Sequence, residues 1–193
     1  MSNLSAPDVA RRDLGSRQPD RVDALVTATL AELRAHGYDG LTVRNAARQA
    51  GVAPATAYTY FGSKDHLVAE AFWRRLQTLD ATASRARSPL GRVQSVLRGI
   101  AELVAAEPEL AAASTTAVLA QDPDVERLRT RIGAAFNGLL AAALGPGGDP
   151  AVLRALNLAL GGALLQAGMG YFSYADLADR MAEVADLLLR EVA

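Results

Sequence analysis

The sequence predicts an all-α protein of about nine helices, organised as a short arm and two domains. Apolar residues recur at i, i+3 and i+4 along most of the chain, which is the spacing of one helix face. Proline and glycine interrupt these runs, and no stretch shows the alternation expected of a strand. We expect a disordered arm over residues 1–18, a first domain over residues 19–66 and a second over residues 67–193.

The composition excludes several classes of function. The 193 residues include no cysteine, which excludes disulfides, thiol catalysis and thiolate metal sites. The net charge is -1, so any affinity for nucleic acid must come from a few placed groups rather than from bulk charge. The sequence contains no P-loop, no G-x-S-x-G and no paired-histidine metal motif. We therefore expect no enzymatic activity, no cofactor and no bound metal.

The location of the protein follows from its hydropathy pattern. The N-terminus lacks the apolar run of a signal peptide. The most apolar stretch, residues 156–169, is broken by glycine and favours a buried helix over a membrane span. We expect a soluble, cytoplasmic protein without a membrane partner.

The arm and the first helix differ in periodicity. Residues 1–18 are polar and aperiodic, which is typical of disorder. Their arginines could reach a DNA minor groove, although a solvated tail is the simpler interpretation. The first helix is predicted over residues 19–36, where Leu25 and Leu33 belong to a clear apolar stripe, and Gly37 closes it.

Two short helices follow, and the rest of the chain is organised around them. Thr42 is a good N-cap for the first, and Gly51 stands where a helix ends in the left-handed region. Pro54 then begins the second helix, predicted over residues 54–60. Two short helices joined by a tight glycine turn are typical of a helix-turn-helix unit, although an ordinary helical hairpin has the same spacing.

The residues in and around this pair resemble the TetR family of bacterial repressors over residues 19–70. The pattern consists of Tyr38, Thr42, Gly51, Thr56, Tyr58, Tyr60, Phe61, Ser63 and Lys64. Three positions depart from the family pattern: Ala53 stands where a capping residue is usual, and Ala46 and Ala57 stand where larger aliphatic residues are usual. The resemblance implies a homodimeric, DNA-binding transcription regulator, expected to be a repressor.

The resemblance also implies which side chains meet double-stranded operator DNA. Phosphates would be held by Thr42, Tyr58, Tyr60 and Lys64, the only lysine in the chain. Base edges would be read by Arg44, Pro54, Ala55, Thr56 and Thr59. Threonine and alanine methyl groups suit the thymine methyl, and an arginine suits guanine.

The second domain is predicted to contain six further helices. The first begins at the N-cap Ser63 and continues toward residue 87. Later boundaries are predicted at Ser88-Pro89, Glu107-Pro108, Asp122-Pro123, the glycine-rich loop over residues 145–148, and Asp149-Pro150. The last helix is predicted over residues 174–192.

A pocket for a small effector is the expected content of this domain, and the sparse charge of its helices favours a largely apolar ligand. The candidate lining residues are Phe72, Trp73, Phe136, Asn137, Gln166, Met169 and Phe172. For each of them, ordinary core packing is the simpler interpretation. The layout of these helices faintly resembles TetR-type repressors of lipid and steroid breakdown.

The last two helices are the candidate dimer interface, since the TetR-like arrangement pairs them into a four-helix seam. The candidate residues are Leu156, Gly162, Ala163, Leu177, Met181, Val184 and Leu188. The small residues among them would equally allow close packing inside one chain. The rival interpretations of the whole chain are a helical protein-interaction module, an apolar-ligand-binding protein without a DNA role, and an enzyme with a buried apolar pocket.

Overall fold

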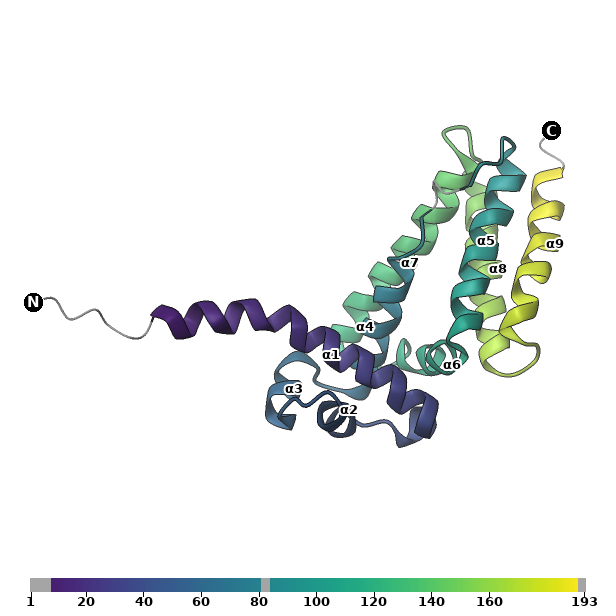
Figure 1. The fold of residues 1–193 in the computed structure, drawn as a ribbon. Helices are drawn as coiled ribbons and strands as arrows, with labels where there is room; N and C mark the ends of the chain where they lie inside the picture. Colours follow the sequence, from purple (N-terminus) through teal and green to yellow (C-terminus); the bar gives the residue numbers. More distant parts are fainter. Residues whose placement is uncertain (1–7, 81–83, 191–193) are drawn as a thin grey trace, which may run out of the picture.

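The computed structural model describes the backbone of residues 8–80 and 84–190, with side chains from residue 19 onward in those ranges. Within this described part, the protein consists of nine α-helices and one short 3-10 turn, without a strand (Figure 1). The all-α prediction is therefore confirmed.

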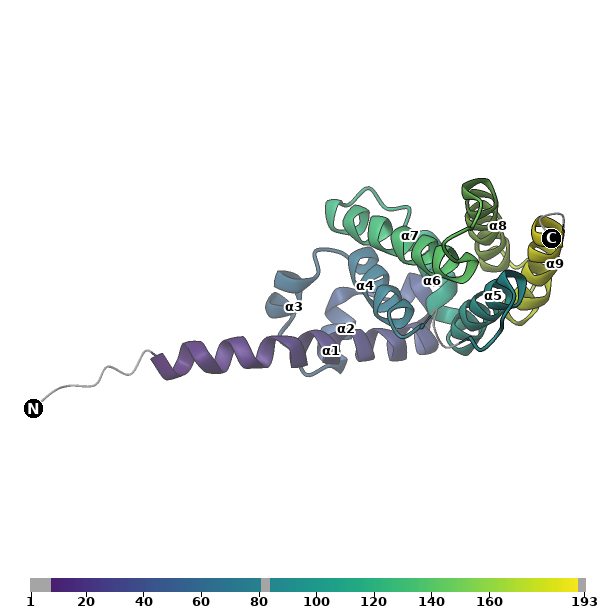
Figure 2. The same ribbon diagram turned by 90° about the horizontal axis from the view of Figure 1, so that it is seen from above.

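Three helices form an N-terminal unit at one end of the molecule. α1 (Asp8–Gly40) is the longest helix and extends away from the other helices toward its N-terminal end (Figures 1 and 2). α2 (Val43–Gln49) packs against α1, and α3 (Pro54–Tyr60) packs against α2. Gly37 adopts a φ of 65°, so the regular part of α1 ends at the glycine that the sequence indicated.

α1 begins earlier than predicted. Residues 8–18 are helical, which differs from the disordered arm expected over residues 1–18; residues 1–7 lie outside the described part. The helical stretch contains three arginines, one alanine and one leucine, which have high helix propensity, together with the unfavourable Gly15. It presents no continuous apolar face, so helical periodicity does not reveal it. Pro19 lies inside α1 and removes one backbone hydrogen bond there.

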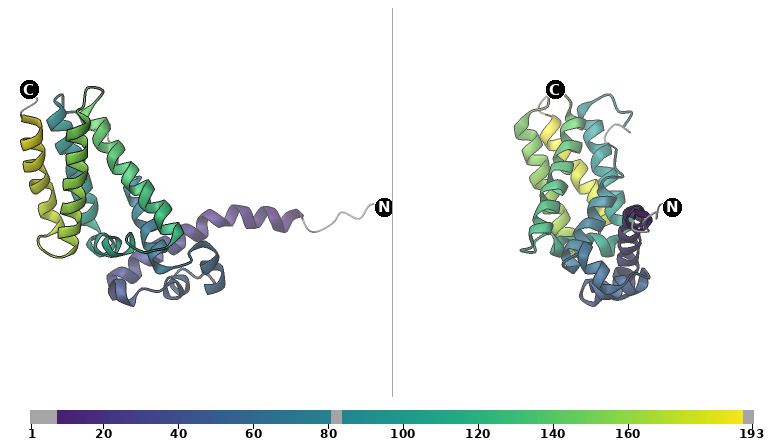
Figure 3. Two further views of the ribbon diagram at one scale, coloured as in Figure 1. Left: turned by 180° about the vertical axis from the view of Figure 1, so that it is seen from behind. Right: turned by 90° about the vertical axis from the view of Figure 1, so that its left-hand side faces the viewer.

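The remaining helices form an elongated bundle above this unit. They are α4 (Lys64–Leu76), α5 (Pro89–Ala106), α6 (Pro108–Ala117), α7 (Pro123–Leu144), α8 (Pro150–Gly168), the 3-10 turn η2 (Tyr174–Asp176) and α9 (Leu177–Leu189). α5, α7, α8 and α9 run along the bundle, whereas α6 lies across its lower end (Figures 1 and 3). α8 and α9 form the edge farthest from the N-terminal unit (Figure 2).

The predicted starts of four helices are confirmed by their N-caps. The side chains of Ser63, Ser88, Asp122 and Asp149 each accept a hydrogen bond from a backbone amide of the first turn, at 2.7 to 3.1 Å. In the last three cases a proline occupies the first helical position. These side chains satisfy amides that the helix itself leaves unpaired.

Two helices end earlier than predicted. α4 stops at Leu76, because Thr78 and Leu79 make short i−3 backbone bonds and the Thr78 hydroxyl also bonds a carbonyl of that turn. The last helix, expected over residues 174–192, starts as the turn η2 and continues as α9 to Leu189; residues 191–193 lie outside the described part.

One apolar core runs through both groups of helices. It extends from Leu25 in α1 through Leu67 and Phe72 in α4 to Leu97 in α5 and Leu140 in α7. Because α4 contributes to both ends of this core, a displacement of α4 is felt by the helix-turn-helix pair and by the bundle alike. The division at residue 66 stays a prediction about functional units.

Candidate nucleic-acid interface and internal cavity

The geometry of α2 and α3 is that of a helix-turn-helix unit. The Thr42 hydroxyl accepts the Asn45 amide at 3.0 Å and caps α2, as predicted. Gly51 adopts a φ of 66°, and the next amide, that of Val52, returns to the Ala47 carbonyl at 2.9 Å. This hydrogen bond closes the turn in the way common at helix C-termini. It fixes the entry into α3 at Pro54.

The small residues of the pair hold the two helices close together. Ala46, Ala47 and Ala57 are fully buried. Small side chains therefore make up the buried face between α2 and α3. Ala53 makes no side-chain cap, so the first turn of α3 has unsatisfied amides that only water can meet.

The nine candidate DNA-contacting side chains lie on the surface of this unit. The exposed ones are Thr42, Arg44, Pro54, Ala55, Tyr58 and Thr59, and those partly exposed are Thr56, Tyr60 and Lys64. Positions 54, 55, 58 and 59 fall on one side of α3, opposite the buried Ala57. This exposed side is free of ion pairs in the described structure, so it is available to a partner.

Lys64 has a structural partner that the sequence did not reveal. Its Nζ donates to the Tyr38 carbonyl at 2.9 Å and lies 4.0 Å from the centre of the Tyr38 ring. The Tyr38 hydroxyl in turn donates to the Asp65 carboxylate. Burial, followed by the hydrogen bond to Asp65, raises the pKa of Tyr38 above its usual range. Lys64 therefore ties the end of α1 to the start of α4, and two of its three N–H donors are left for a phosphate.

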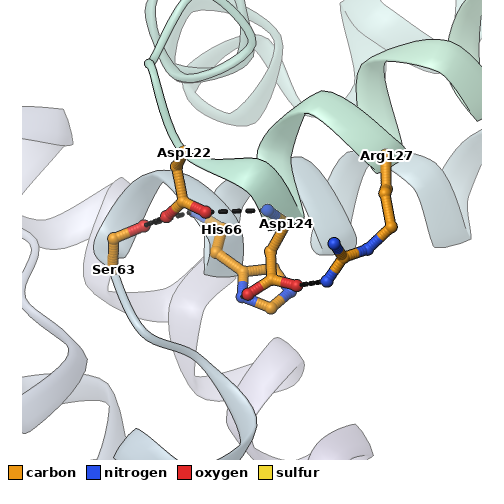
Figure 4. A network of polar contacts seen from close by, with 5 residues as sticks. All are labelled: Ser63, His66, Asp122, Asp124 and Arg127. Carbon is orange, nitrogen blue, oxygen red and sulfur yellow. Dashed lines mark hydrogen bonds and ion pairs between the residues drawn. The ribbon is translucent and has the colours of Figure 1, made fainter.

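A polar junction joins the start of α4 to the start of α7 (Figure 4). The Ser63 hydroxyl donates to Asp122 at 2.7 Å, and His66 Nδ1 lies 3.7 Å from the Asp124 carboxylate, which also pairs with Arg127. The hydrogen bond from Ser63, with smaller contributions from backbone amides and His66, lowers the pKa of Asp122 against the opposing effect of burial. Sequence spacing could not have found this contact, because it joins residues 59 positions apart.

Ion pairs fix the other end of α4. Arg75 holds Glu107, at the junction of α5 and α6, through two hydrogen bonds of 2.9 and 2.8 Å. Arg34 of α1 reaches the same carboxylate at 3.4 Å. Arg74 pairs with Glu70 and with Asp23 of α1. α4 is thus attached to α1 along its length and to the bundle at both ends.

An apolar cavity of about 310 Å³ lies between α4, α5, α6, α7 and α8 and is open on the side of the exposed Leu119 and Leu165. Its walls include Phe72, Val104, Ala111, Ile132, Phe136 and Leu164. Three hydroxyl groups also line it, from Ser114, Thr115 and Tyr174, and no charged side chain does. Among the groups of residues that the described structure brings together, none has the three His, Asp or Glu side chains that a metal ion would need.

Two of the seven predicted pocket residues, Phe72 and Phe136, line this cavity. The others do not: Gln166 and Met169 are exposed, Trp73 packs against the core, Asn137 accepts from Asn157 at 3.2 Å, and Phe172 lies under Arg180. Ser114 and Thr115 were missed, because a serine or threonine hydroxyl inside an apolar helix usually bonds its own backbone.

The predicted dimer residues divide in the same way. Leu156, Leu177 and Met181 are wrong, because they are completely buried within the single chain and have no surface to offer a partner. Gly162, Ala163, Val184 and Leu188 are partly exposed. The exposed apolar side chains are instead Leu158 (78%) and Leu165 (46%) on α8, Met169 (61%) at its end and Leu187 (76%) on α9.

The fold and the exposed α3 surface define a helix-turn-helix DNA-binding protein with an attached helical bundle. The model of the family described as bacterial regulatory proteins, tetR family, matches residues 25–71. An uncharacterized HTH-type transcriptional regulator of Mycobacterium tuberculosis is 45% identical over 176 residues, which cover 90% of this chain and 82% of that protein. The chain belongs to the tetR family of transcriptional regulators.

Further relatives agree with this membership. The HTH-type transcriptional repressor KstR of Rhodococcus jostii is 32% identical over 146 residues, covering 74% of this chain and 69% of that protein. A TetR transcriptional regulator from Rhodococcus sp. RHA1 superposes with a TM-score of 0.74 at 22% identity, over 92% of this chain and 100% of that one. The Thermus thermophilus repressor FadR, solved with lauroyl-CoA, superposes with a TM-score of 0.66 at 20% identity, over 89% and 95%.

Proposed function

We propose that the protein is a homodimeric repressor that binds operator DNA through α3 and is released by an apolar effector in the apolar cavity between α4 and α8. The observation that carries the proposal is the position of α4. This helix begins at Lys64 beside the helix-turn-helix unit and places Phe72 in the cavity wall two turns later. One rigid element therefore touches both sites.

For the DNA, α3 enters the major groove and the flanking groups hold the backbone. Pro54, Ala55, Thr56 and Thr59 face base edges, together with Arg44 on α2. Phosphates are held by Thr42, Tyr58, Tyr60 and Lys64, with the first turn of α4 supplying amides at the positive end of the helix dipole. Six of these nine side chains are exposed and three are partly exposed, which supports this assignment.

For the dimer, a second copy of the chain covers the exposed apolar side of α8 and α9. Leu158, Leu165 and Met169 follow one another at helical spacing, so they form a single stripe. α8 is the one helix in the described ranges that is long and apolar enough by composition to cross a membrane. An apolar surface confined to one side of a helix fits a protein partner, and two-fold dimers are the commonest assembly.

For release, the effector must bind the DNA-incompetent arrangement more tightly than the DNA-bound one. A shift of α4 in each subunit changes the spacing of the two recognition helices, and both must match their half-sites at once. A coupling free energy of about 1–3 kcal/mol is typical. Operator DNA must then weaken effector binding by the same factor.

The test is a selection of genomic DNA fragments with the purified protein, followed by affinity measurements at several salt concentrations. The proposal predicts a near-palindromic preferred sequence and salt-dependent binding. Arg44→Ala and Thr56→Ala should relax base preference at particular positions, whereas Tyr60→Ala should weaken all sequences alike. A protein that selects no sequence would support the rival reading of a protein-interaction module.

A further inference from the structure

We infer that the Tyr174 hydroxyl is the hydrogen-bond anchor of the effector cavity, and that the effector is a compact, uncharged, largely apolar molecule with one acceptor oxygen. This inference rests on the cavity assigned in the proposed function and names the chemistry of its ligand. It follows from which hydroxyl groups in the cavity wall already donate a hydrogen bond to the protein.

Tyr174 is the one lining hydroxyl whose proton has no acceptor in the described structure. Ser114 donates to the Leu110 carbonyl at 2.7 Å, and Thr115 donates to the Ala111 carbonyl at 3.1 Å. Only 8% of Tyr174 is exposed, and its hydroxyl oxygen is buried and makes no hydrogen bond. Buried hydroxyl groups without a partner are uncommon, because the lost hydration is not replaced.

The electrostatic surroundings of Tyr174 are neutral. Burial raises the pKa of Tyr174, and the Thr115 hydroxyl partly offsets this effect, although the two oxygens do not meet in hydrogen-bond geometry. No charged side chain contributes to that shift, and none lines the cavity. A carboxylate placed here would lose its hydration without meeting a cation, so a ketone, ester or alcohol oxygen is the favoured acceptor.

The turn that carries the phenol is held by its own hydrogen bonds. Ser173 and Asp176 bond each other on either side of it, through the Ser173 amide at 3.2 Å and the Ser173 hydroxyl at 2.7 Å. The adjacent Leu177 is completely buried. A donor held in this way loses little conformational freedom on binding.

The size of the cavity limits the ligand. Its volume of about 310 Å³ is at the small end of the range for ligand pockets. Gly161 forms part of the wall, and a Cβ added there would meet no atom within 4 Å. The wall is therefore open at Gly161, which is also exposed.

The first experiment compares two probes, nonan-2-one and nonanoate, on the wild type and Tyr174→Phe by calorimetry. We expect the ketone to bind the wild type about tenfold more tightly than the variant, as the loss of one buried hydrogen bond predicts. The affinity of the wild type for nonanoate should be lower than its affinity for the ketone by a factor of about ten or more. Tyr171→Phe is the matched control, because Tyr171 is exposed and lies outside the cavity; it should bind like the wild type.

The second experiment measures the melting temperature without ligand. Tyr174→Phe should melt at the same temperature as the wild type or higher, because it removes a hydroxyl that lacks a partner. A lower melting temperature would mean that the hydroxyl serves the fold, and it would overturn the inference. Equal ketone affinity in wild type and variant, tighter binding of nonanoate, or no binding of the ketone to the wild type would each overturn it as well.

The outcome is separable from that of the proposed function. DNA selection is carried out in parallel with the wild type and both variants. If no DNA sequence is selected but the ketone still binds the wild type more tightly than Tyr174→Phe, the repressor proposal fails and the assignment of Tyr174 as the anchor is retained. If a DNA sequence is selected and the ketone binds the wild type and Tyr174→Phe equally, only the assignment of Tyr174 is wrong.

Discussion

The hydroxyl of Ser63 donates a hydrogen bond to Oδ2 of Asp122 over 2.7 Å, and these two side chains are also the N-caps of α4 and α7 (Figure 4). α4 begins at the helix-turn-helix unit, and α7 forms one wall of the cavity. The first turns of both helices are therefore stabilised by one shared contact, which either site can disturb.

Replacing Asp122 should cost more than replacing an ordinary cap. Asp122→Ala removes the cap of α7 and leaves Ser63 without its acceptor, so the free energy of unfolding should fall by about 2 kcal/mol. Asp149→Ala is the matched control, since Asp149 also precedes a proline and caps through the same i+2 amide but has no second partner among the bonds described. It should cost about 1 kcal/mol. Equal losses in urea titrations would show that the Ser63 bond contributes nothing.

The same contact makes stability depend on acid. The pKa of Asp122 is lowered, mainly by the Ser63 hydrogen bond. Because the pKa is lower in the folded state, the ionised carboxylate stabilises the fold at any pH above the pKa of the unfolded state, about 3.9. This contribution is lost as the pH falls through the pKa of the folded state. The free energy of unfolding of Asp122→Asn should be lower than that of the wild type by a constant amount between about pH 7 and pH 5, and this difference should shrink below about pH 4. A deficit that grows in acid would contradict this assignment.

The exposed stripe on α8 gives a direct test of the dimer. Leu158→Arg should yield a protomer of 20.2 kDa by light scattering, where the wild type should show about twice that mass. Leu158 is 78% exposed, so the arginine should leave the free energy of unfolding of the protomer nearly unchanged. Ala134→Arg, at an exposed position of α7, is the control and should stay dimeric. A wild type of protomer mass at micromolar concentration would count against the dimer.

The sequence predicted best where the signal is local. Thr42, Gly51 and Pro54 specify a cap, a left-handed turn and a helix start by their own chemistry, and the structure confirms all three. Leu156 and Leu158 show the limit of periodicity. Periodicity predicts the helix α8, but packing against the neighbouring helices determines which of the two residues is buried.

The cavity lies beyond that limit for the same reason. Phe72 and Phe136 were predictable as large apolar residues, whereas Tyr174 belongs to a short turn that lies at the cavity only after α8 and α9 have packed. The Ser63–Asp122 and Lys64–Tyr38 contacts are likewise tertiary, joining positions 59 and 26 residues apart.

Lys64 should affect both folding and DNA binding. Lys64→Ala removes the hydrogen bond and the cation–π contact to Tyr38, so the free energy of unfolding should fall by about 1–2 kcal/mol while DNA affinity also falls. Tyr58→Ala is the comparison, because Tyr58 is about half exposed and should lower affinity alone. Loss of affinity in Lys64→Ala without any loss of stability would mean that the Tyr38 contacts contribute nothing.

The missing cap of α3 can be supplied. Ala53 has the extended backbone of an N-cap residue, with φ −60° and ψ 133°, but no side-chain acceptor. Ala53→Thr offers a hydroxyl to the orphan amides of the first turn and should raise the free energy of unfolding by about 0.5–1 kcal/mol. Urea titration of the isolated protein measures this gain.

Ala53→Val is the control, since valine has the shape of threonine without the hydroxyl. Ala53 is exposed, so neither side chain has to displace the core. The threonine variant can be both more stable than the valine variant and tighter in binding the selected DNA. That result would show that fraying of α3 limits recognition, because a capped first turn no longer has to be ordered when DNA binds. If the two variants are equally stable, the hydroxyl does not cap, and the first turn of α3 is already satisfied by water.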